Sequence, residues 1–339
     1  MKEKVKIEIS TTSVLKILAL ILGLVFIYYI RNVVALVFVV AIIVAGLTPF
    51  VEWLVKQKIP RIFSVIIVYL ALLGIMTLVV YAIIPPLASQ VELISANSSY
   101  YVNKLSIITD NISTIQFQSQ NVLEFISKYL GNISGSVVTS IASAFGGAAS
   151  AVTVMVLSFY ILLERNSVEK ILLAFMPERH HEKTLKIYEK LNSKLGRWLR
   201  GQVLLAFIIG LASYIVLTIF GIKYALALAV IAGALEIVPI IGPIFAGALA
   251  AIVAYFTDAS WWTIIGIIIS YIVVQQLEGH FLVPNIMGQA VGLSPVIIII
   301  AIMIGSQLGG IIGAILAIPI AAAVAVVAQQ WGEEKKLDI

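Results

Sequence analysis

The feature that most constrains this chain is a long stretch, residues 221–319, that carries almost no charge. No Lys or Arg occurs between Lys223 and Lys335. Gly and Pro interrupt this apolar stretch twice, at 233–243 (GALEIVPIIGP) and at 305–319 (GSQLGGIIGAILAIP). Irregular backbone at membrane depth occurs only where it is buried in protein or lines a cavity, because lipid cannot satisfy its N–H and C=O groups. Two such breaks in corresponding places are typical of the binding site of a transporter.

Composition places the chain among membrane proteins. Of its 339 residues, 61% are hydrophobic and 12% are charged, which is far from the average of a soluble domain. The net charge of +5 does not predict a nucleic-acid partner, because the basic residues flank apolar runs. There is no cysteine, which excludes disulfides and thiol chemistry. HExxH and Walker motifs are absent too, so we expect no enzyme activity, no cofactor and no resident metal.

The order of composition divides the chain into six segments. We expect three transmembrane helices in 1–86, an extracytoplasmic amphipathic helical segment in 87–136, a fourth transmembrane helix in 137–163, basic cytoplasmic amphipathic helices in 164–201, a transport core in 202–330 and a cytoplasmic tail in 331–339. Lys and Arg gather before the first helix, near 56–61 and throughout 165–200, so the positive-inside rule puts both termini in the cytoplasm.

Three local expectations accompany this division. Residues 48–61 (TPFVEWLVKQKIPR) should form a loop after the second helix, and Pro85 and Pro86 should end the third. In the basic segment, apolar residues recur every three or four positions from Leu185 to Trp198. This amphipathic helix could lie along the membrane surface or pack in the helix bundle, and the sequence leaves both possibilities open.

The predicted fold is an all-α polytopic membrane protein. We expect about six crossings plus two re-entrant helical hairpins, the first built from 224–235 and 245–256 and the second from 296–304 and 311–327. Each arm of the first pair gives only about 18 Å of helix, too little to cross a bilayer alone. The alternative is eight transmembrane helices. Residues 278–292 would be cytoplasmic with hairpins and external with eight simple crossings.

The motifs of the C-terminal third also carry a family resemblance. They are GIKY (221–224), AGALEIVPIIGP (232–243), WW (261–262), QQLEGHFLVPNIMG (275–288), VGLSP (291–295) and GGIIGAILAIPIAA (309–322). With them, the chain resembles the autoinducer-2 exporter family. The resemblance implies a multi-pass transporter of the prokaryotic cytoplasmic (inner) membrane, linked to export of the quorum-sensing molecule autoinducer-2. Some family members are linked instead to Na⁺(Li⁺)/H⁺ antiport. A homo-oligomer also fits the resemblance.

Glu236 is the sharpest candidate for function. It sits between Leu235 and Ile237 beside the first break. An ionisable group within a membrane costs roughly 2.5–3.5 kcal/mol on insertion scales and is a functional-site hypothesis by default. Glu236 could bind a proton or, transiently, Na⁺. Alternatively, its carboxylate could cap backbone N–H groups freed at the break and have only a structural role.

The other candidate residues belong to three polar or Gly/Pro-rich patches. Gln275 and Glu278 share a helix face at i, i+3 and could face a cavity or lie at an interfacial helix end. The second break could present helix-end partial charges to a ligand, or its glycines could simply permit tight packing. The complete set of candidate pathway residues is Glu236, Pro239, Gly242, Pro243, Gln275, Gln276, Glu278, Pro284, Asn285, Gly305, Gln307, Gly309 and Gly310.

These features predict a secondary-active transporter that works by alternating access and is coupled to H⁺ or Na⁺. The substrate would be a small polar organic molecule, and the resemblance implies one like autoinducer-2. Its partners would be the lipid bilayer, that substrate, the coupling ion and further copies of the chain. A Na⁺(Li⁺)/H⁺ antiporter is the alternative. A passive channel and an intramembrane protease using Ser306 and His280 fit the residues less well.

Overall fold

The structure is a computed structural model that describes residues 18, 22, 23, 25, 26, 29–96, 147–164, 166–237 and 241–337. All regular structure within these residues is helical. Five of the described helical segments are long and apolar enough to cross a membrane. A sixth is reached if α7 and α8, which bend by 92° at their junction, count as one span. The expected all-α polytopic membrane fold is therefore confirmed. Most of the predicted 87–136 segment lies outside the described residues.

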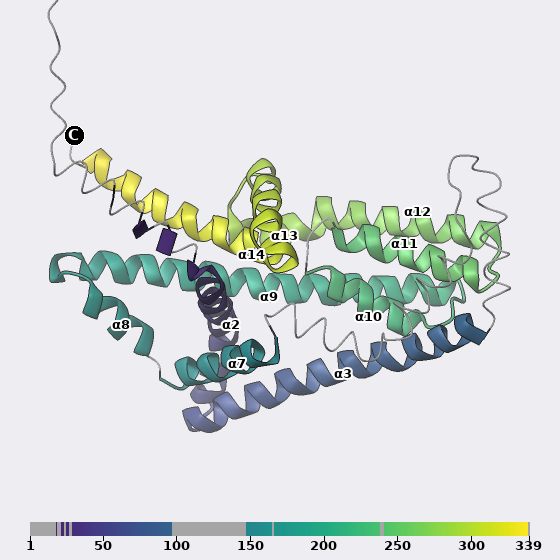
Figure 1. Cartoon of the computed structure of the whole chain (residues 1–339), viewed down its shortest axis with the longest axis horizontal. Helices are drawn as coiled ribbons and strands as arrows, with labels where there is room; N and C mark the ends of the chain where they lie inside the picture. The colour runs from purple at the N-terminus through teal and green to yellow at the C-terminus, as the bar shows by residue number, and fades with distance from the viewer. Residues whose placement is uncertain are drawn as a thin grey trace, which may run out of the picture.

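The described elements follow in this order (Figure 1). They are α2 (Arg31–Lys56), α3 (Arg61–Ala96), α7 (Ala148–Leu163), α8 (Ser167–Phe175), the 3₁₀ turn η1 (Glu178–His180), α9 (His181–Ile219), α10 (Ala225–Leu235), α11 (Ile241–Phe256), α12 (Trp261–Leu277), the π-helical turn η2 (Glu278–Leu282), α13 (Val283–Val291) and α14 (Pro295–Leu337).

Helix α2 continues through Pro49 to Lys56, so the loop expected at 48–61 is wrong. A proline inside a helix leaves the carbonyl four residues earlier without its hydrogen bond. That carbonyl belongs to Ala45, and it accepts a hydrogen bond from Arg200 Nη1 of α9 at 3.4 Å. Gly196 allows this approach, since a Cβ there would lie 2.4 Å from the Ala45 oxygen. Tertiary packing thus supplies what the proline removes.

The expected end of α3 at Pro85 and Pro86 is also wrong, since the helix continues to Ala96. A proline lacks only its own N–H, and its fixed φ near −65° is already helical. The apolar part of the helix, Arg61–Pro85, is long enough to span a bilayer.

Helix α9 is one unbroken helix of 39 residues, about 58 Å long. It joins the basic amphipathic stretch and the expected fifth crossing without a break. Leu195 and Trp198 are buried in a cluster with residues of α2, α13 and α14, including Ile42, Met287 and Leu316. Of the two possibilities left open by the sequence, packing in the bundle is the one observed.

Three apolar clusters hold the helices together. The first joins α2, α9, α13 and α14. The second joins the end of α9 to α10, α11 and α12, and the third joins α2, α3 and α7. Helix α9 therefore contributes to two cores and is the element on which α10 and α14 are positioned (Figure 1).

Both breaks fold the chain back on itself. Helices α10 and α11 pack side by side, with Leu228 and Ala232 of one in the same cluster as Ala246 and Ala250 of the other. In α14 the turn lies at Gly309 and Gly310, whose φ/ψ angles are not helical. The arm Pro295–Gly310 then packs on Ile312–Gln330, and both elements are helical hairpins.

Candidate functional site

Glu278 lies inside a continuous helical rod rather than at a helix end. The rod comprises α12, η2 and α13, and its apolar part, Trp261–Gly288, is long enough to span a bilayer. Glu278 is the first residue of η2 and is only 4% exposed. A π-helical turn accommodates one extra residue and occurs frequently at functional sites. The interfacial helix end considered from the sequence is therefore excluded.

Glu236 ends the first arm of the α10–α11 hairpin. Its backbone N–H still bonds to Ala232 O, and its own carbonyl accepts a hydrogen bond from Gln202 Nε2 of α9. Gly242 packs directly on this turn, since a Cβ at Gly242 would lie 2.8 Å from the Glu236 N and Cα atoms. The backbone around Glu236 is thus held from two sides, by α9 and by the start of α11.

The two carboxyl groups meet in the interior. Glu236 is fully buried, and the carboxyl group of Glu278 lies within hydrogen-bonding reach of it. Among the described residues, no N–H or hydroxyl group donates to Glu236 Oε1, Glu236 Oε2 or Glu278 Oε2. Two carboxyl groups in contact form a hydrogen bond only when one of them carries a proton. The pair is therefore a site built for a proton or another cation.

Gln202 completes this site, and sequence reasoning missed it. Its side chain is 2% exposed, and its Oε1 atom also lacks a donor among the described residues. The buried site thus holds four oxygen atoms that can accept a hydrogen bond or a cation, from Gln202, Glu236 and Glu278. The available signal was a lone amide at the start of the apolar run 202–220.

A second buried polar contact lies farther along the same two elements. The hydroxyl group of Tyr271 on α12 lies beside that of Ser213 on α9. Tyr271 is two helical turns before Glu278, and Ser213 is three turns after Gln202. The interface of α9 and α12 therefore carries buried polar groups at two levels, and sequence reasoning missed this upper pair as well.

The remaining candidates of the first patches divide by burial. Pro243 is fully buried beside Gly242, and Gln275 is half-buried one turn before Glu278. Gln276, Pro284 and Asn285 lie on the exposed surface of the α12–α13 rod. The Asn285 amide donates to Phe281 O at 2.8 Å, within its own helix. Pro239 lies outside the described residues.

The second break is not in contact with the carboxyl pair. Gln307 is exposed, and a Cβ added at Gly309 or Gly310 would meet no atom within 4 Å, so the turn stands in open space. The tight packing in this hairpin is between Gly305 and Gly313, where a Cβ on Gly313 would lie 1.9 Å from Gly305 O. The packing role weighed from the sequence is present, with Gly305 rather than Gly309 as the partner.

The described residues contain no cluster of three or more His, Asp or Glu side chains that could hold a metal ion. A resident transition metal therefore has no ligand set in this part of the chain. The oxygen atoms of Gln202, Glu236 and Glu278 suit a proton or a hard monovalent cation instead.

Comparison with known proteins agrees with this architecture. Residues 17–333 match the family model described as AI-2E family transporter. YueF of Bacillus subtilis is 27% identical over 300 residues, which cover 83% of this chain and 81% of YueF. YrrI of the same organism is 25% identical, over 83% of this chain and 81% of YrrI. The AI-2 transport protein TqsA of Escherichia coli is 23% identical, over 86% of this chain and 85% of TqsA.

Proposed function

Because the chain belongs to the AI-2E family of membrane transporters, we propose that it is a secondary-active exporter whose coupling site is the Glu236–Glu278 pair. The observation that carries this proposal is the contact of two buried carboxyl groups between apolar helices. A scaffold protein has no use for such a pair, since burying an unpaired polar group costs free energy. Transport coupled to a cation requires one.

The pair binds H⁺ or Na⁺ by a simple electrostatic mechanism. Two carboxylates in contact, away from water, repel each other strongly, and a shared proton or a bound cation relieves that repulsion. Gln202 Oε1 supplies a further oxygen atom. Loss of the cation leaves like charges facing each other across the contact of α10 with η2. The loaded and unloaded pairs therefore favour different separations of these two elements.

The hairpins provide the parts that move. The α10–α11 hairpin carries Glu236, whereas the α12–η2–α13 rod carries Glu278. Displacement of the hairpin against the rod opens the site toward one side of the membrane and then the other. In this scheme Gly242 and Pro243 transmit the movement of α11 to Glu236, and the α14 hairpin closes the pathway on the α13 side.

The substrate class follows from the family and from the site. The relative TqsA is named an AI-2 transport protein, and we propose a small, polar, hydroxyl-bearing molecule of that kind for this chain. Gln275 and Gln276 offer amide donors and acceptors next to the pair. The protein would act in the cytoplasmic membrane with both termini inside, as a homo-oligomer.

The test is flux in proteoliposomes that contain the wild type, Glu236→Gln, Glu278→Gln or Glu182→Gln. Glu182 is an exposed residue that pairs with Lys186 at 2.6 Å, so its variant is a charge-matched control. Proton and Na⁺ fluxes are followed with autoinducer-2 absent and then present. We expect cation flux that depends on autoinducer-2 in the wild type and in Glu182→Gln, and at least a tenfold loss in both site variants.

Two results would contradict this proposal. Cation exchange without any organic substrate, lost in the site variants, would make the protein a Na⁺(Li⁺)/H⁺ antiporter that uses the same pair. Wild-type flux in Glu236→Gln and Glu278→Gln would remove the carboxyl pair from the mechanism altogether. A substrate flux that persists without any ion gradient would indicate a channel.

A further inference from the structure

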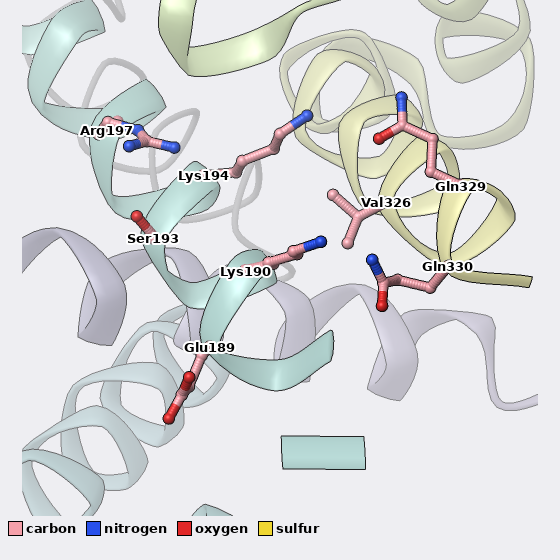
Figure 2. Close-up of a pocket in the computed structure, with 8 residues that line it drawn as sticks. All are labelled: Glu189, Lys190, Ser193, Lys194, Arg197, Val326, Gln329 and Gln330. Atoms are coloured by element: carbon pink, nitrogen blue, oxygen red, sulfur yellow. The ribbon is translucent and has the colours of Figure 1, made fainter. Parts of the chain in front are cut away.

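A hollow of about 430 Å³ lies where the first half of α9 meets the last turns of α14 (Figure 2). It is distinct from the carboxyl pair, since its α9 residues precede Gln202 by one to three helical turns. None of its lining residues takes part in the transport scheme above. Its α14 wall belongs to the last two turns of the apolar segment Ile312–Gln330, where an apolar helix meets the polar border of a membrane.

One wall of the hollow is strongly basic. Lys190, Lys194 and Arg197 are spaced i, i+4, i+7, which places all three on one face of α9. Figure 2 shows the two lysine side chains extending across the hollow toward α14. Glu189 also lines the hollow, but its carboxylate points away from the Lys190 ammonium group (Figure 2). The nearest acidic side chain on α9 therefore does not neutralise this face.

The opposite wall offers amides over an apolar floor. Gln329 and Gln330 contribute the amides, and Val326, one turn before Gln330, is buried. Among the described residues, neither Lys190 nor Arg197 takes part in an ion pair. Glu182, the acidic residue two turns before Lys190, pairs with Lys186 instead. Three cations on one helix face repel one another, so the hollow lacks a counter-charge of its own.

We propose that this hollow binds a phosphate-bearing anion, supplied by the headgroup of an anionic phospholipid or by a free phosphate compound. Ammonium and guanidinium groups form short, charge-assisted hydrogen bonds with phosphate oxygens, and the amide N–H groups of the glutamines add neutral ones. Basic pockets between transmembrane helices are known to take anionic headgroups. The apolar floor at Val326 suits the glycerol and upper acyl carbons of a lipid.

Binding here would tie two cores together. The anion would bridge α9 to α14, and Lys194 Nζ lies only 3.8 Å from where a Cβ of Gly292 would be, in the link between α13 and α14. A ligand that binds only the folded arrangement stabilises it by RT ln(1 + [L]/Kd). The prediction is therefore measurable as thermal stabilisation, independently of any transport assay.

The test uses the purified full-length chain in detergent with four probes. These are phosphatidylglycerol, zwitterionic phosphatidylcholine, glycerol 3-phosphate and inorganic phosphate. Native mass spectrometry counts bound phospholipid, and thermal unfolding gives the apparent Kd. The variant K190Q/R197Q removes two cations from the hollow. The matched control K183Q/K186Q removes two cations from the same helix outside it.

We expect the wild type and K183Q/K186Q to bind phosphatidylglycerol, and K190Q/R197Q to bind it at least tenfold more weakly. Stabilisation by phosphatidylglycerol alone identifies the lipid as the source of the phosphate. Stabilisation by glycerol 3-phosphate or inorganic phosphate as well identifies the phosphate group itself.

Equal binding of phosphatidylcholine would overturn the proposal, and so would equal loss in the two double variants. Should K190Q/R197Q not fold, the wild type alone remains decisive. Its affinity must fall steeply between low and high NaCl, and affinity that is independent of salt would contradict an anion site.

Discussion

The chemistry of this protein is concentrated in two carboxyl groups that no donor satisfies. Glu236 and Glu278 lack N–H and hydroxyl partners among the described residues, yet they are buried in contact with each other. Such an arrangement sacrifices stability, because buried acceptors without donors are costly. Proteins retain sites of this kind where the strain serves function. Stability and transport should therefore respond in opposite directions to changes at this pair.

Replacement of Glu236 by Gln should stabilise the protein while it abolishes coupled transport. The new amide can donate to the Glu278 carboxylate and to Gln202 Oε1, which satisfies acceptors that are orphaned in the wild type. A gain of ~1 kcal/mol corresponds to a rise in Tm of about 2–4 °C. Thermal unfolding in detergent measures it, with Glu182→Gln as the control.

The opposite result would also be informative. A fall of several degrees in Tm would show that the Glu236 carboxylate is a structural cap for backbone outside the described residues. The two carboxyl groups should also behave as a unit. Gln at both positions should therefore change Tm by an amount that differs from the sum of the two single changes.

Gly242 should be intolerant of any side chain. A Cβ at this position would lie 2.8 Å from the backbone N and Cα of Glu236, which cannot rotate away. Gly242→Ala should cost about 1–3 kcal/mol and displace Glu236 from its partner. Gly288→Ala is the matched control, since nothing lies within 4 Å of its added methyl group. Similar Tm values for the two variants would contradict the close packing.

At the level of elements, the two hairpins were predictable and their neighbours were not. Gly- and Pro-rich breaks mark the turns near Glu236 and at Gly309–Gly310 directly in the sequence. The continuation of α2 through Pro49 was not predictable in this way. It depends on a hydrogen bond from Arg200, 155 residues away, and on the space left by Gly196. Local rules describe a chain without such partners.

The carboxyl pair shows the same limit. The sequence identified Glu236 and Glu278 separately, as ionisable residues in apolar surroundings. Their contact depends on the π-helical turn at 278–282 and on the packing of α10 and α12 around α9, neither of which has a local signature. Gln202 escaped notice because a single amide in an apolar run is common. Its role appears only when the Glu236 carbonyl is placed beside it.

The α14 hairpin should depend on its glycines in an unequal way. A methyl group on Gly313 would lie 1.9 Å from Gly305 O, so Gly313→Ala must force the two arms apart. We expect a loss of about 1–3 kcal/mol and a clear drop in Tm. Gly309→Ala should have little effect, because its φ of −139° suits alanine and its surroundings are open. A similar loss in both variants would show that the turn, and not the crossing, limits stability.

The π-helical turn should set the rotation between two halves of the α12–α13 rod. Deletion of Gly279 would convert it to an α-helix and rotate everything after it by about 100°. Glu278 could then face Glu236, or Met287 could remain in its apolar cluster, but not both. We expect helical content by circular dichroism to persist while transport is lost. Gly279→Ala keeps the residue count and meets no atoms, so its transport should remain near wild type.

For the whole molecule, the hairpin geometry makes a prediction about sidedness. Lys223 precedes α10 and Asp258 follows α11, so a hairpin leaves both on the same side of the membrane. The basic first half of α9 should lie on the other side, by the positive-inside rule. Lys223→Cys and Asp258→Cys should therefore be labelled from outside the cell by a membrane-impermeant thiol reagent, and Glu182→Cys only after permeabilisation.

The natural chain suits this experiment because it contains no cysteine. Each variant thus carries a single thiol without any background substitution. Labelling of Asp258→Cys from the side opposite to Lys223→Cys would make α10 and α11 one broken span and would contradict a hairpin.

The unbroken length of α9 has a mechanical consequence. Gly201 lies near its middle, where a Cβ would be 2.9 Å from the Met287 sulfur, and it divides the helix into arms of about 30 Å and 27 Å. A rigid beam pivoting there amplifies small rotations. A tilt of about 10° moves each end by about 5 Å in opposite directions, close to the pitch of an α-helix. A sub-ångström adjustment beside Gln202, next to the fulcrum, would thus be felt at both ends of the beam as a change of several ångströms.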